Sequence, residues 1–225
     1  MNLPQPGDYI DIHSHGAKPA TGIFIIENLM AHEERTPEDI PEQAFTFGIH
    51  PWYLNEKNYN QLLTSVIAVT GFQNLFAIGE AGFDKYKGPS MELQRKAFEE
   101  QIAISEENAK PLVIHCVKAW AELFAAYKEL KPKMPWLIHG FRGNVELATQ
   151  FLSKGMYLSF WFDFVIRPES AKLLRSLPRE RIFFETDGAN VNIKEIYGKV
   201  ATDLNIPVGN LKTIITRNFN DFFKL

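Results

Sequence analysis

The sequence is poor in cysteine, in long apolar runs and in excess positive charge, and each shortage excludes a class of protein. The single cysteine, Cys116, excludes an internal disulfide framework and is typical of a protein in the reducing cytoplasm, where we expect this chain. No apolar run approaches about 18 residues and residues 1–8 have no signal-peptide pattern, so we expect no membrane span. The net charge of −3 argues against a surface that binds nucleic acid by charge alone.

The amino-acid composition is that of a folded chain with a large hydrophobic core. Hydrophobic residues make up 45% of the 225 residues and aromatic residues 13%, and no stretch has the composition of a disordered segment. We find no internal repeat, low-complexity stretch or linker. The length is within the range of one α/β barrel or sandwich, so we expect a single domain over residues 1–225.

Eight short apolar segments predict buried β-strands, and segments with helical spacing of apolar residues separate most of them. Continuous apolar strands are typical of a parallel sheet that is covered on both faces. Eight such units predict an α/β fold, a TIM-type (β/α)8 barrel, whose active site lies at the carboxyl ends of the strands. The expected strands lie at 9–16, 23–26, 44–50, 75–80, 112–115, 136–139, 156–160 and 182–187, and the expected helices at 55–69, 90–109, 119–130, 145–152, 168–174, 196–204 and 211–222.

The beginning of the chain departs from this regular alternation. The first two strands are separated by too few residues for a crossover helix, so we expect a shortened first β/α unit. Residues 30–42 are polar and contain Pro37 and Pro41. We expect this segment to be a loop with at most one helical turn.

Polar side chains recur at the carboxyl ends of the expected strands. His13 and His15 end the first strand, where side chains two residues apart point to the same face. Any one of these histidines is more often a hydrogen-bonded loop residue than a ligand, but their recurrence at one face of a barrel indicates a metal site. The set comprises five of the six histidines and two carboxylates: His13, His15, His50, Glu80, His115, His139 and Asp187.

The number of ligands in this set suggests more than one ion. Even four of these five histidines, together with the two carboxylates, exceed what one four-coordinate ion needs. They suit two divalent ions about 3.5–4 Å apart, bridged by a carboxylate and a water whose pKa the ions lower. An aspartate is then left to handle the proton, so the pattern indicates an enzyme that catalyses hydrolysis. Mg, Mn and Zn all suit mixed histidine and carboxylate ligands, which leaves the identity of the metal open.

Several motifs resemble the TatD family of metal-dependent deoxyribonucleases, within the amidohydrolase-like barrels. The most specific are the Gly-Glu-x-Gly-Phe-Asp segment at 79–84 and the Glu-Thr-Asp segment at 185–187. The His-x-His pair is shared by many metallohydrolases. The matching segments follow the family's order over nearly the whole chain: 11–15, 48–52, 77–84, Gln94 with Phe98, 111–115, 139–143, 185–187 and 218–223.

This resemblance implies a role for each ligand. Glu80 is expected to bridge the two ions, and Asp187 is expected to act as the general base in addition to binding metal. The implied ligand groups are His13, His15 and Asp187 for one ion, and His115 and His139 for the other.

The implied reaction is hydrolysis of DNA phosphodiester bonds, often as an exonuclease. His50 is expected to lie near a substrate phosphate. Arg142 either grips a phosphate with two hydrogen bonds or is a solvated loop residue. Val117 stands where the family has a substrate-binding arginine, and the adjacent Lys118 is the candidate replacement.

The departures from the family leave other functions open. Gly16 and Ala17 stand where the family usually has an aspartate, and the loop after Asp187 is short. One alternative is a metal-dependent hydrolase of the same barrel class that cleaves a small phosphoester, an amide or a lactone. Another is a non-catalytic binding protein, against which the complete ligand set argues.

Two further features have alternative readings. Asp84 either orients a ligand histidine or is a turn residue. Three tryptophans, Trp52, Trp120 and Trp161, either stack on bases or pack in the core and loops. Cys116 follows a candidate ligand and is expected to be a buried thiol with no catalytic role.

Overall fold

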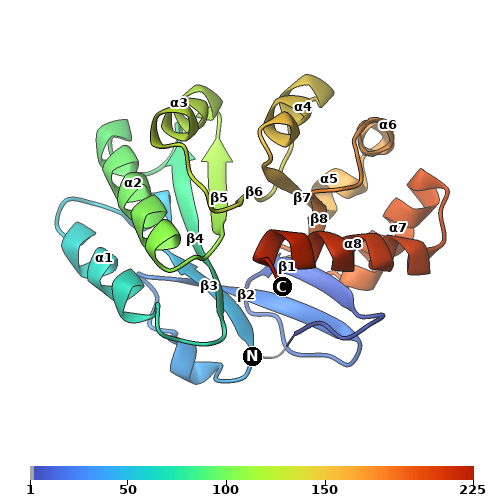
Figure 1. Cartoon of the computed structure of the whole chain (residues 1–225), viewed down its shortest axis with the longest axis horizontal. Helices are drawn as coiled ribbons and strands as arrows, with labels where there is room; N and C mark the ends of the chain where they lie inside the picture. The colour runs from blue at the N-terminus through green and yellow to red at the C-terminus, as the bar shows by residue number, and fades with distance from the viewer. Residues whose placement is uncertain (1–2) are drawn as a thin grey trace. The chain divides into compact units, whose positions relative to one another are not determined.

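The computed structural model describes residues 3–225, and its strands and helices alternate along the chain (Figure 1). The strands follow one another in chain order, β1 to β8, in the sheet. The pairs β1–β2, β3–β4, β4–β5 and β7–β8 are parallel. The eight strands are β1 Tyr9–Ser14, β2 Ile23–Met30, β3 Ala44–Gly48, β4 Leu75–Asp84, β5 Leu112–Val117, β6 Trp136–Ile138, β7 Tyr157–Trp161 and β8 Ile182–Glu185.

Helices connect most of these strands. Residues 15–22, all of which the structure describes, contain no helix, so the prediction of a shortened first β/α unit is confirmed. Between β2 and β3 the described chain forms only a short 3-10 turn, as expected. The helices are η1 Pro37–Asp39, η2 Pro51–Tyr53, α1 Tyr59–Ala68, α2 Met91–Glu107, α3 Trp120–Leu130, α4 Val145–Ser153, α5 Phe162–Val165, α6 Pro168–Ser176, α7 Ile193–Leu204 and α8 Val208–Phe223.

Several predicted element boundaries were wrong. β2 continues past Ile26 to Met30 and β4 continues past Glu80 to Asp84, because polar residues in these extensions are buried and hydrogen-bonded inside the fold. β8 ends at Glu185, so Asp187 follows the strand. The short helices η2 and α5 were not predicted, since three- or four-residue helices carry no periodic pattern.

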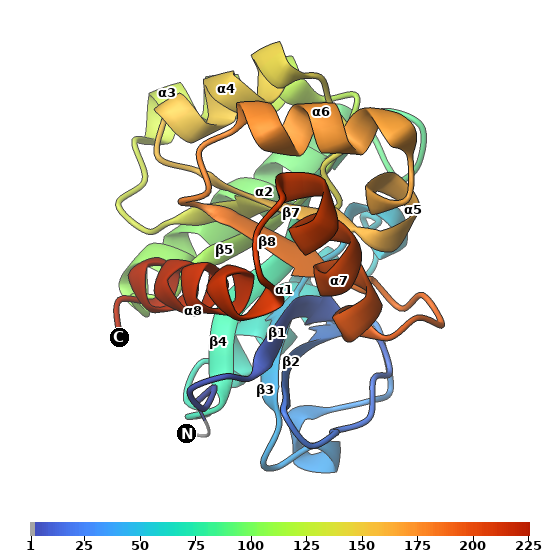
Figure 2. The same ribbon diagram turned by 90° about the vertical axis from the view of Figure 1, so that its right-hand side faces the viewer.

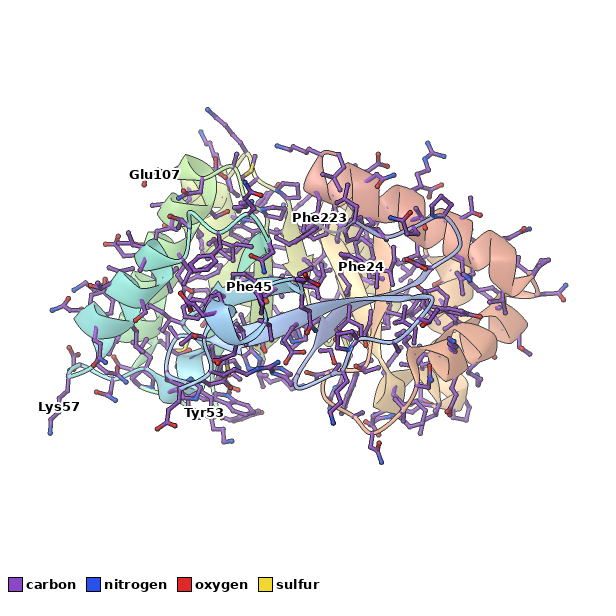
Figure 3. All side chains as sticks on the ribbon, turned by 90° about the horizontal axis from the view of Figure 1, so that it is seen from below. Phe24, Phe45, Tyr53, Lys57, Glu107 and Phe223 are labelled. Atoms are coloured by element: carbon purple, nitrogen blue, oxygen red, sulfur yellow. The ribbon has the colours of Figure 1, made fainter. Side chains whose placement is uncertain are left out.

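The chain forms two compact units, and the first comprises residues 28–137. Here β3, β4 and β5 form consecutive parallel pairs, α2 packs against β4, and α1 lies beside α2 (Figure 1). Phe45 on β3 and Phe98 on α2 are fully buried. Figure 3 shows Phe45 among the packed side chains, whereas Lys57 extends outward.

Two glycines set the close approach of β4 to β5. Gly79 and Gly82 both have positive φ angles, and a Cβ atom added to either would lie 2.3 Å from the Val113 carbonyl oxygen or 2.1 Å from that of His115. Only glycine fits such contacts. The Gly-Glu-x-Gly segment therefore holds Glu80 beside the end of β5.

The second unit comprises residues 3–27 and 138–225. β1 lies beside β8, and α7 and α8 pack against this pair and against each other (Figure 2). The hydroxyl of buried Tyr197 on α7 donates to the Ile10 carbonyl at 3.0 Å and accepts from the Ile10 N–H at 3.2 Å. These bonds fix β1, the strand that carries His13.

The described helices also bear on the membrane prediction. None of the helices in residues 3–225 is both long enough and apolar enough to cross a membrane. The expectation of a single domain over residues 1–225 stays a prediction.

Candidate metal centre

Three predicted site residues meet in the first unit and form what we call the buried cluster: His50, Glu80 and His115. His50 lies just after β3, Glu80 lies within β4 and His115 lies within β5, and all three are buried. The Glu80 Oε2 atom lies 3.5 Å from His50 Nε2 and 3.5 Å from His115 Nδ1. All three ligand atoms lie within 4.8 Å of one another.

The hydrogen bonds of the two histidines suit His115 to bind a metal and His50 to donate a hydrogen bond. His115 Nε2 lies 3.2 Å from Asp84 Oδ2, which fixes the proton on Nε2 and leaves the Nδ1 lone pair directed at Glu80, as in a metal ligand. His50 Nδ1 instead accepts the Trp52 backbone N–H at 3.1 Å. A neutral imidazole that accepts at Nδ1 carries its proton on Nε2, so His50 presents a donor to the site.

Glu80 is held by neutral partners. The Asn28 amide donates to Glu80 Oε1 at 3.1 Å, and the Thr46 hydroxyl donates to Asn28 Oδ1 at 2.7 Å. Both partners are buried. This chain of bonds leaves Oε2 as the Glu80 oxygen that faces the histidines.

Asp84 both orients His115 and forms a turn, so both readings of the sequence apply. Its Oδ2 accepts from Trp52 Nε1 at 2.6 Å, and its Oδ1 accepts from the backbone N–H groups of Tyr86 and Lys87 at 2.7 and 3.0 Å. Burial alone would raise the pKa of this carboxyl, but the hydrogen bonds from Trp52, Tyr86, His115 and Lys87 hold the pKa below its usual value. Asp84 is therefore an ionised partner for His115.

The second unit contains what we call the open cluster: His13, His15, His139, Glu185 and Asp187. Asp187 Oδ1 lies 3.7 Å from Nε2 of both His13 and His15, and the ligand atoms of these three residues lie within 4.8 Å of one another. His139, Glu185 and Asp187 form a second such group. In contrast to the buried cluster, the side chains of His15 and Asp187 are 29% and 22% exposed.

Asp187 reaches the two histidines through an unusual backbone conformation. Its φ angle is +50°, and its N–H donates to the His13 carbonyl at 3.2 Å. Aspartate tolerates this left-handed region better than most residues. The turn directly after β8 therefore places the carboxylate beside the end of β1.

The nitrogen-to-oxygen separations in both clusters fit a shared ion. At 3.5–3.7 Å they are longer than hydrogen bonds. Two ligand atoms bound tetrahedrally to one ion at ~2.1 Å lie roughly 3.4 Å apart. The ligand atoms and their spacing thus suit a divalent cation in two places. One is among His13, His15 and Asp187, and the other is between His115 and Glu80.

Glu185 begins the Glu-Thr-Asp motif, but the sequence assigned it no role at the site. It is fully buried, its Oε1 accepts the Gly140 N–H at 2.6 Å, and its Oε2 accepts the Ser159 hydroxyl at 2.5 Å. Burial opposes ionisation, but His139, His13 and Ser159 hold the pKa of Glu185 below its usual value. A glutamate inside the apolar run 182–185 was the available signal, because a buried carboxylate requires a partner.

Asp11 supports the turn that carries Asp187. Its carboxylate accepts the Thr186 N–H at 3.0 Å and the Thr186 hydroxyl at 2.7 Å, and Ser14 Oγ lies 2.9 Å from that hydroxyl. Burial raises the pKa of Asp11 to about 7, although the bonds from Thr186 oppose the rise. These contacts tie the end of β8 to β1.

A cavity of about 360 Å3 adjoins the open cluster in the second unit. Gly16 and Ala17 line this cavity and donate their N–H groups to fully buried Glu27 at 2.5 and 3.2 Å. Further lining residues include His15, Lys18, Thr186 and Asn190. A concave space of this size beside metal-type ligands is suited to a small ligand or to part of a larger one.

The remaining predicted substrate contacts are exposed. Arg142 follows His139 in the second unit, and its guanidinium lies over the Trp161 ring, 4.0 Å from the ring centre. Lys118 follows β5 in the first unit with a φ angle of +56°. The substrate-binding roles of Arg142 and Lys118 stay predictions. Cys116 is buried, and burial raises the pKa of its thiol, as expected for an inert residue.

Comparison with known proteins identifies the family. The sequence model of the family described as TatD related DNase matches residues 25–224. The chain belongs to the TatD family. The resemblance seen in its motifs is thereby confirmed.

Curated TatD relatives match most of the chain at low identity. An uncharacterized metal-dependent hydrolase of Mycoplasma genitalium is 27% identical over 206 residues, covering 79% of this chain and 77% of its own length. A 3'-5' ssDNA/RNA exonuclease TatD of Citrobacter koseri is 28% identical over 177 residues, covering 76% and 67%. The chain is therefore a metal-dependent hydrolase that uses a divalent ion.

Solved structures of similar proteins show the fold. The TatD homologue YJJV of Escherichia coli superimposes with a TM-score of 0.85 at 18% identity, covering 98% of this chain and 100% of that one. A TatD family hydrolase of Entamoeba histolytica gives 0.77 at 16% identity, covering 96% and 97%. The predicted α/β barrel fold is confirmed.

Proposed function

We propose that this hydrolase cleaves phosphodiester bonds of DNA in an exonuclease-like reaction that uses two divalent ions. The observation that carries the proposal is that each compact unit holds imidazole and carboxylate atoms at the spacing of ligands to one ion. The relatives named as 3'-5' ssDNA/RNA exonucleases support nucleic acid as the substrate. Both clusters would serve the same reaction, as the family resemblance implies.

The residues that hold the ions follow from their hydrogen bonds. His13, His15 and Asp187 would bind one ion, and His115 Nδ1 with Glu80 would bind the second. The resemblance adds His139 to the second ion and makes Glu80 the bridge. Both points stay predictions, and within its own unit His139 lies beside Glu185 and Asp187.

The ions, when bound, would activate water and neutralise charge on the phosphate. Asp187 is positioned to accept the proton of the attacking water, because its carboxylate is partly exposed beside two histidines. His50 would donate its Nε2 proton to a phosphate oxygen, and Arg142 and Lys118 would contribute charge at the exposed edge.

The metal and the location are also parts of this proposal. Mixed histidine and carboxylate ligands accept Mg, Mn or Zn. The single buried thiol of Cys116 supports a reducing cytoplasmic location.

The test is release of nucleotides from an end-labelled single-stranded DNA oligonucleotide, with Mg2+, Mn2+ or Zn2+ added in turn. Asp187→Asn controls for contaminating nuclease, and Asp163→Asn, at an exposed aspartate paired with Arg167, is the matched control. We expect stepwise shortening by wild type and Asp163→Asn and none by Asp187→Asn. Equal cleavage by all three proteins would contradict the proposal.

A second candidate function is hydrolysis of a small phosphoester, amide or lactone. The loss of two family substrate residues, at Gly16 and Val117, and the cavity of about 360 Å3 beside the open cluster favour it. Metal-loaded protein that leaves DNA intact but cleaves a small phosphoester would replace the first proposal with this one.

A further inference from the structure

The one histidine outside the clusters stacks on an exposed aromatic ring. His32, just after β2, lies parallel to Tyr53 with a ring-centre distance of 3.6 Å and an angle of 13° between the planes. His32 is exposed and Tyr53, which is labelled in Figure 3, is 42% exposed. Core packing would bury such rings, so the stack is a surface feature.

Trp52 continues this aromatic surface toward the buried cluster. Its side chain is 38% exposed, and the Lys87 ammonium lies over the ring at 3.6 Å from the ring centre. The Trp52 ring also meets His50 and His115 edge-on, at ring-centre distances of 4.9 and 5.4 Å. We call His32, Trp52, Tyr53 and Lys87 the stacking platform; all four lie in residues 28–137.

Two members of the stacking platform, Trp52 and Lys87, are fixed to the buried cluster through Asp84. The same carboxylate oxygen accepts from Trp52 Nε1 and contacts His115, while the other oxygen accepts the Lys87 N–H. Gly88 packs so closely that an added Cβ would lie 2.4 Å from the Pro51 carbonyl oxygen. The Trp52 ring and the backbone of Lys87 are therefore held at a set position relative to His115, and the Tyr53 ring lies 5.7 Å from that of His50.

We propose that the stacking platform binds the bases of a single-stranded nucleic acid, next to the phosphodiester that is to be cleaved. This inference rests on the proposed function and assigns the residues that would hold the bases of its substrate. Every base has a π-face that stacks on exposed aromatic rings, whereas paired bases are covered by their neighbours. The Lys87 ammonium supplies the positive charge that a phosphate backbone requires, although the chain as a whole carries −3.

The experiment measures stacking without hydrolysis. A single-stranded DNA oligonucleotide with 2-aminopurine at its 3' end, and its RNA counterpart, would be titrated with Asp187→Asn protein in Mg2+. The 2-aminopurine fluorescence falls when the base stacks. The variants Tyr53→Ala, Tyr53→Phe and His32→Ala would be made in this background, with Ile67→Ala, an exposed apolar residue on α1, as the control.

We expect Tyr53→Ala and His32→Ala to weaken binding of at least one oligonucleotide by roughly tenfold and to reduce the quenching. Tyr53→Phe, which keeps the ring, and Ile67→Ala should bind as the parent does. An oligonucleotide with abasic sites at its 3' end should bind the parent about tenfold more weakly, and Tyr53→Ala should cause no further loss.

Three results would overturn the inference: equal binding by all variants, equal binding of abasic and normal oligonucleotides, or no binding of either nucleic acid. Because the assay reads binding only, it separates this inference from the proposed function. Base-dependent binding without cleavage by wild type would leave the stacking platform standing and refute the nuclease. Cleavage without base dependence would do the reverse.

Discussion

The buried cluster and the open cluster use the same residue types in different surroundings. In the buried cluster, the side chains of His50, Glu80 and His115 are 5%, 4% and 10% exposed, and Asp84 and Asn28 orient His115 and Glu80. In the open cluster, His15 and Asp187 are 29% and 22% exposed. The buried cluster is thus built to hold its groups still, whereas the open cluster leaves a carboxylate accessible to water.

This difference separates two roles that a ligand list alone would merge. A base that takes a proton from water must be reachable by water, and Asp187 meets this condition better than Glu80 does. A ligand that stays fixed needs a second bond that orients it, as His115 has with Asp84. Substitutions at Asp187, Asp84 and Glu185 test this division of roles.

Asp187→Asn should abolish most of the activity while the protein stays folded. An amide keeps the shape of the side chain but cannot accept the proton, so we expect kcat to fall by roughly 1,000-fold. Steady-state kinetics beside circular dichroism would measure this, with Asp163→Asn as the matched control. Activity within threefold of wild type would refute the role of Asp187.

Asp84→Asn should weaken metal binding without removing any ligand. The amide no longer offers a charged acceptor to His115, and loss of such a partner lowers metal affinity or activity by about 10–100-fold. Competition with a fluorescent chelator would measure the affinity. An unchanged affinity would mean that Asp84 only stabilises the following turn and the Trp52 side chain, with no effect on metal binding.

Glu185→Gln should lower the stability of the folded protein and make that stability less dependent on pH. The neutral amide no longer offers a charged acceptor to the Gly140 N–H and the Ser159 hydroxyl, which should lower the free energy of unfolding by about 1–3 kcal/mol. Because the folded-state pKa of Glu185 lies below its usual value, its stabilisation is present above the unfolded-state pKa and is lost as the pH falls through the folded-state pKa.

Urea unfolding in EDTA at neutral and acidic pH would test this prediction. Wild type should lose more stability on acidification than Glu185→Gln does, and the exposed-site variant Glu146→Gln should behave as wild type. Parallel pH curves for wild type and Glu185→Gln would show that Glu185 is not ionised in the folded protein.

The sequence predicted the existence and order of the eight strands well because each is an apolar run with a polar residue near its carboxyl end, but it misplaced several ends by two to four residues: β3 ends before His50, and β5 continues past His115 to Val117. It did not reveal that His50 accepts the Trp52 N–H, since a hydrogen bond fixed by the turn at Pro51 leaves no compositional trace. Asn28 was missed because β2 was expected to end at Ile26. Long-range partners such as Asp84 with Trp52 depend on folded geometry and could not be read from spacing.

The central claim is that two ions bind and that His115, but not His50, is a ligand. The most direct test is the number of divalent ions per chain, measured by mass spectrometry of protein purified without chelators. We expect two ions for wild type, two for His50→Ala with kcat/KM reduced on the order of 100-fold, and one for His115→Ala. Loss of an ion from His50→Ala, with two retained by His115→Ala, would contradict it.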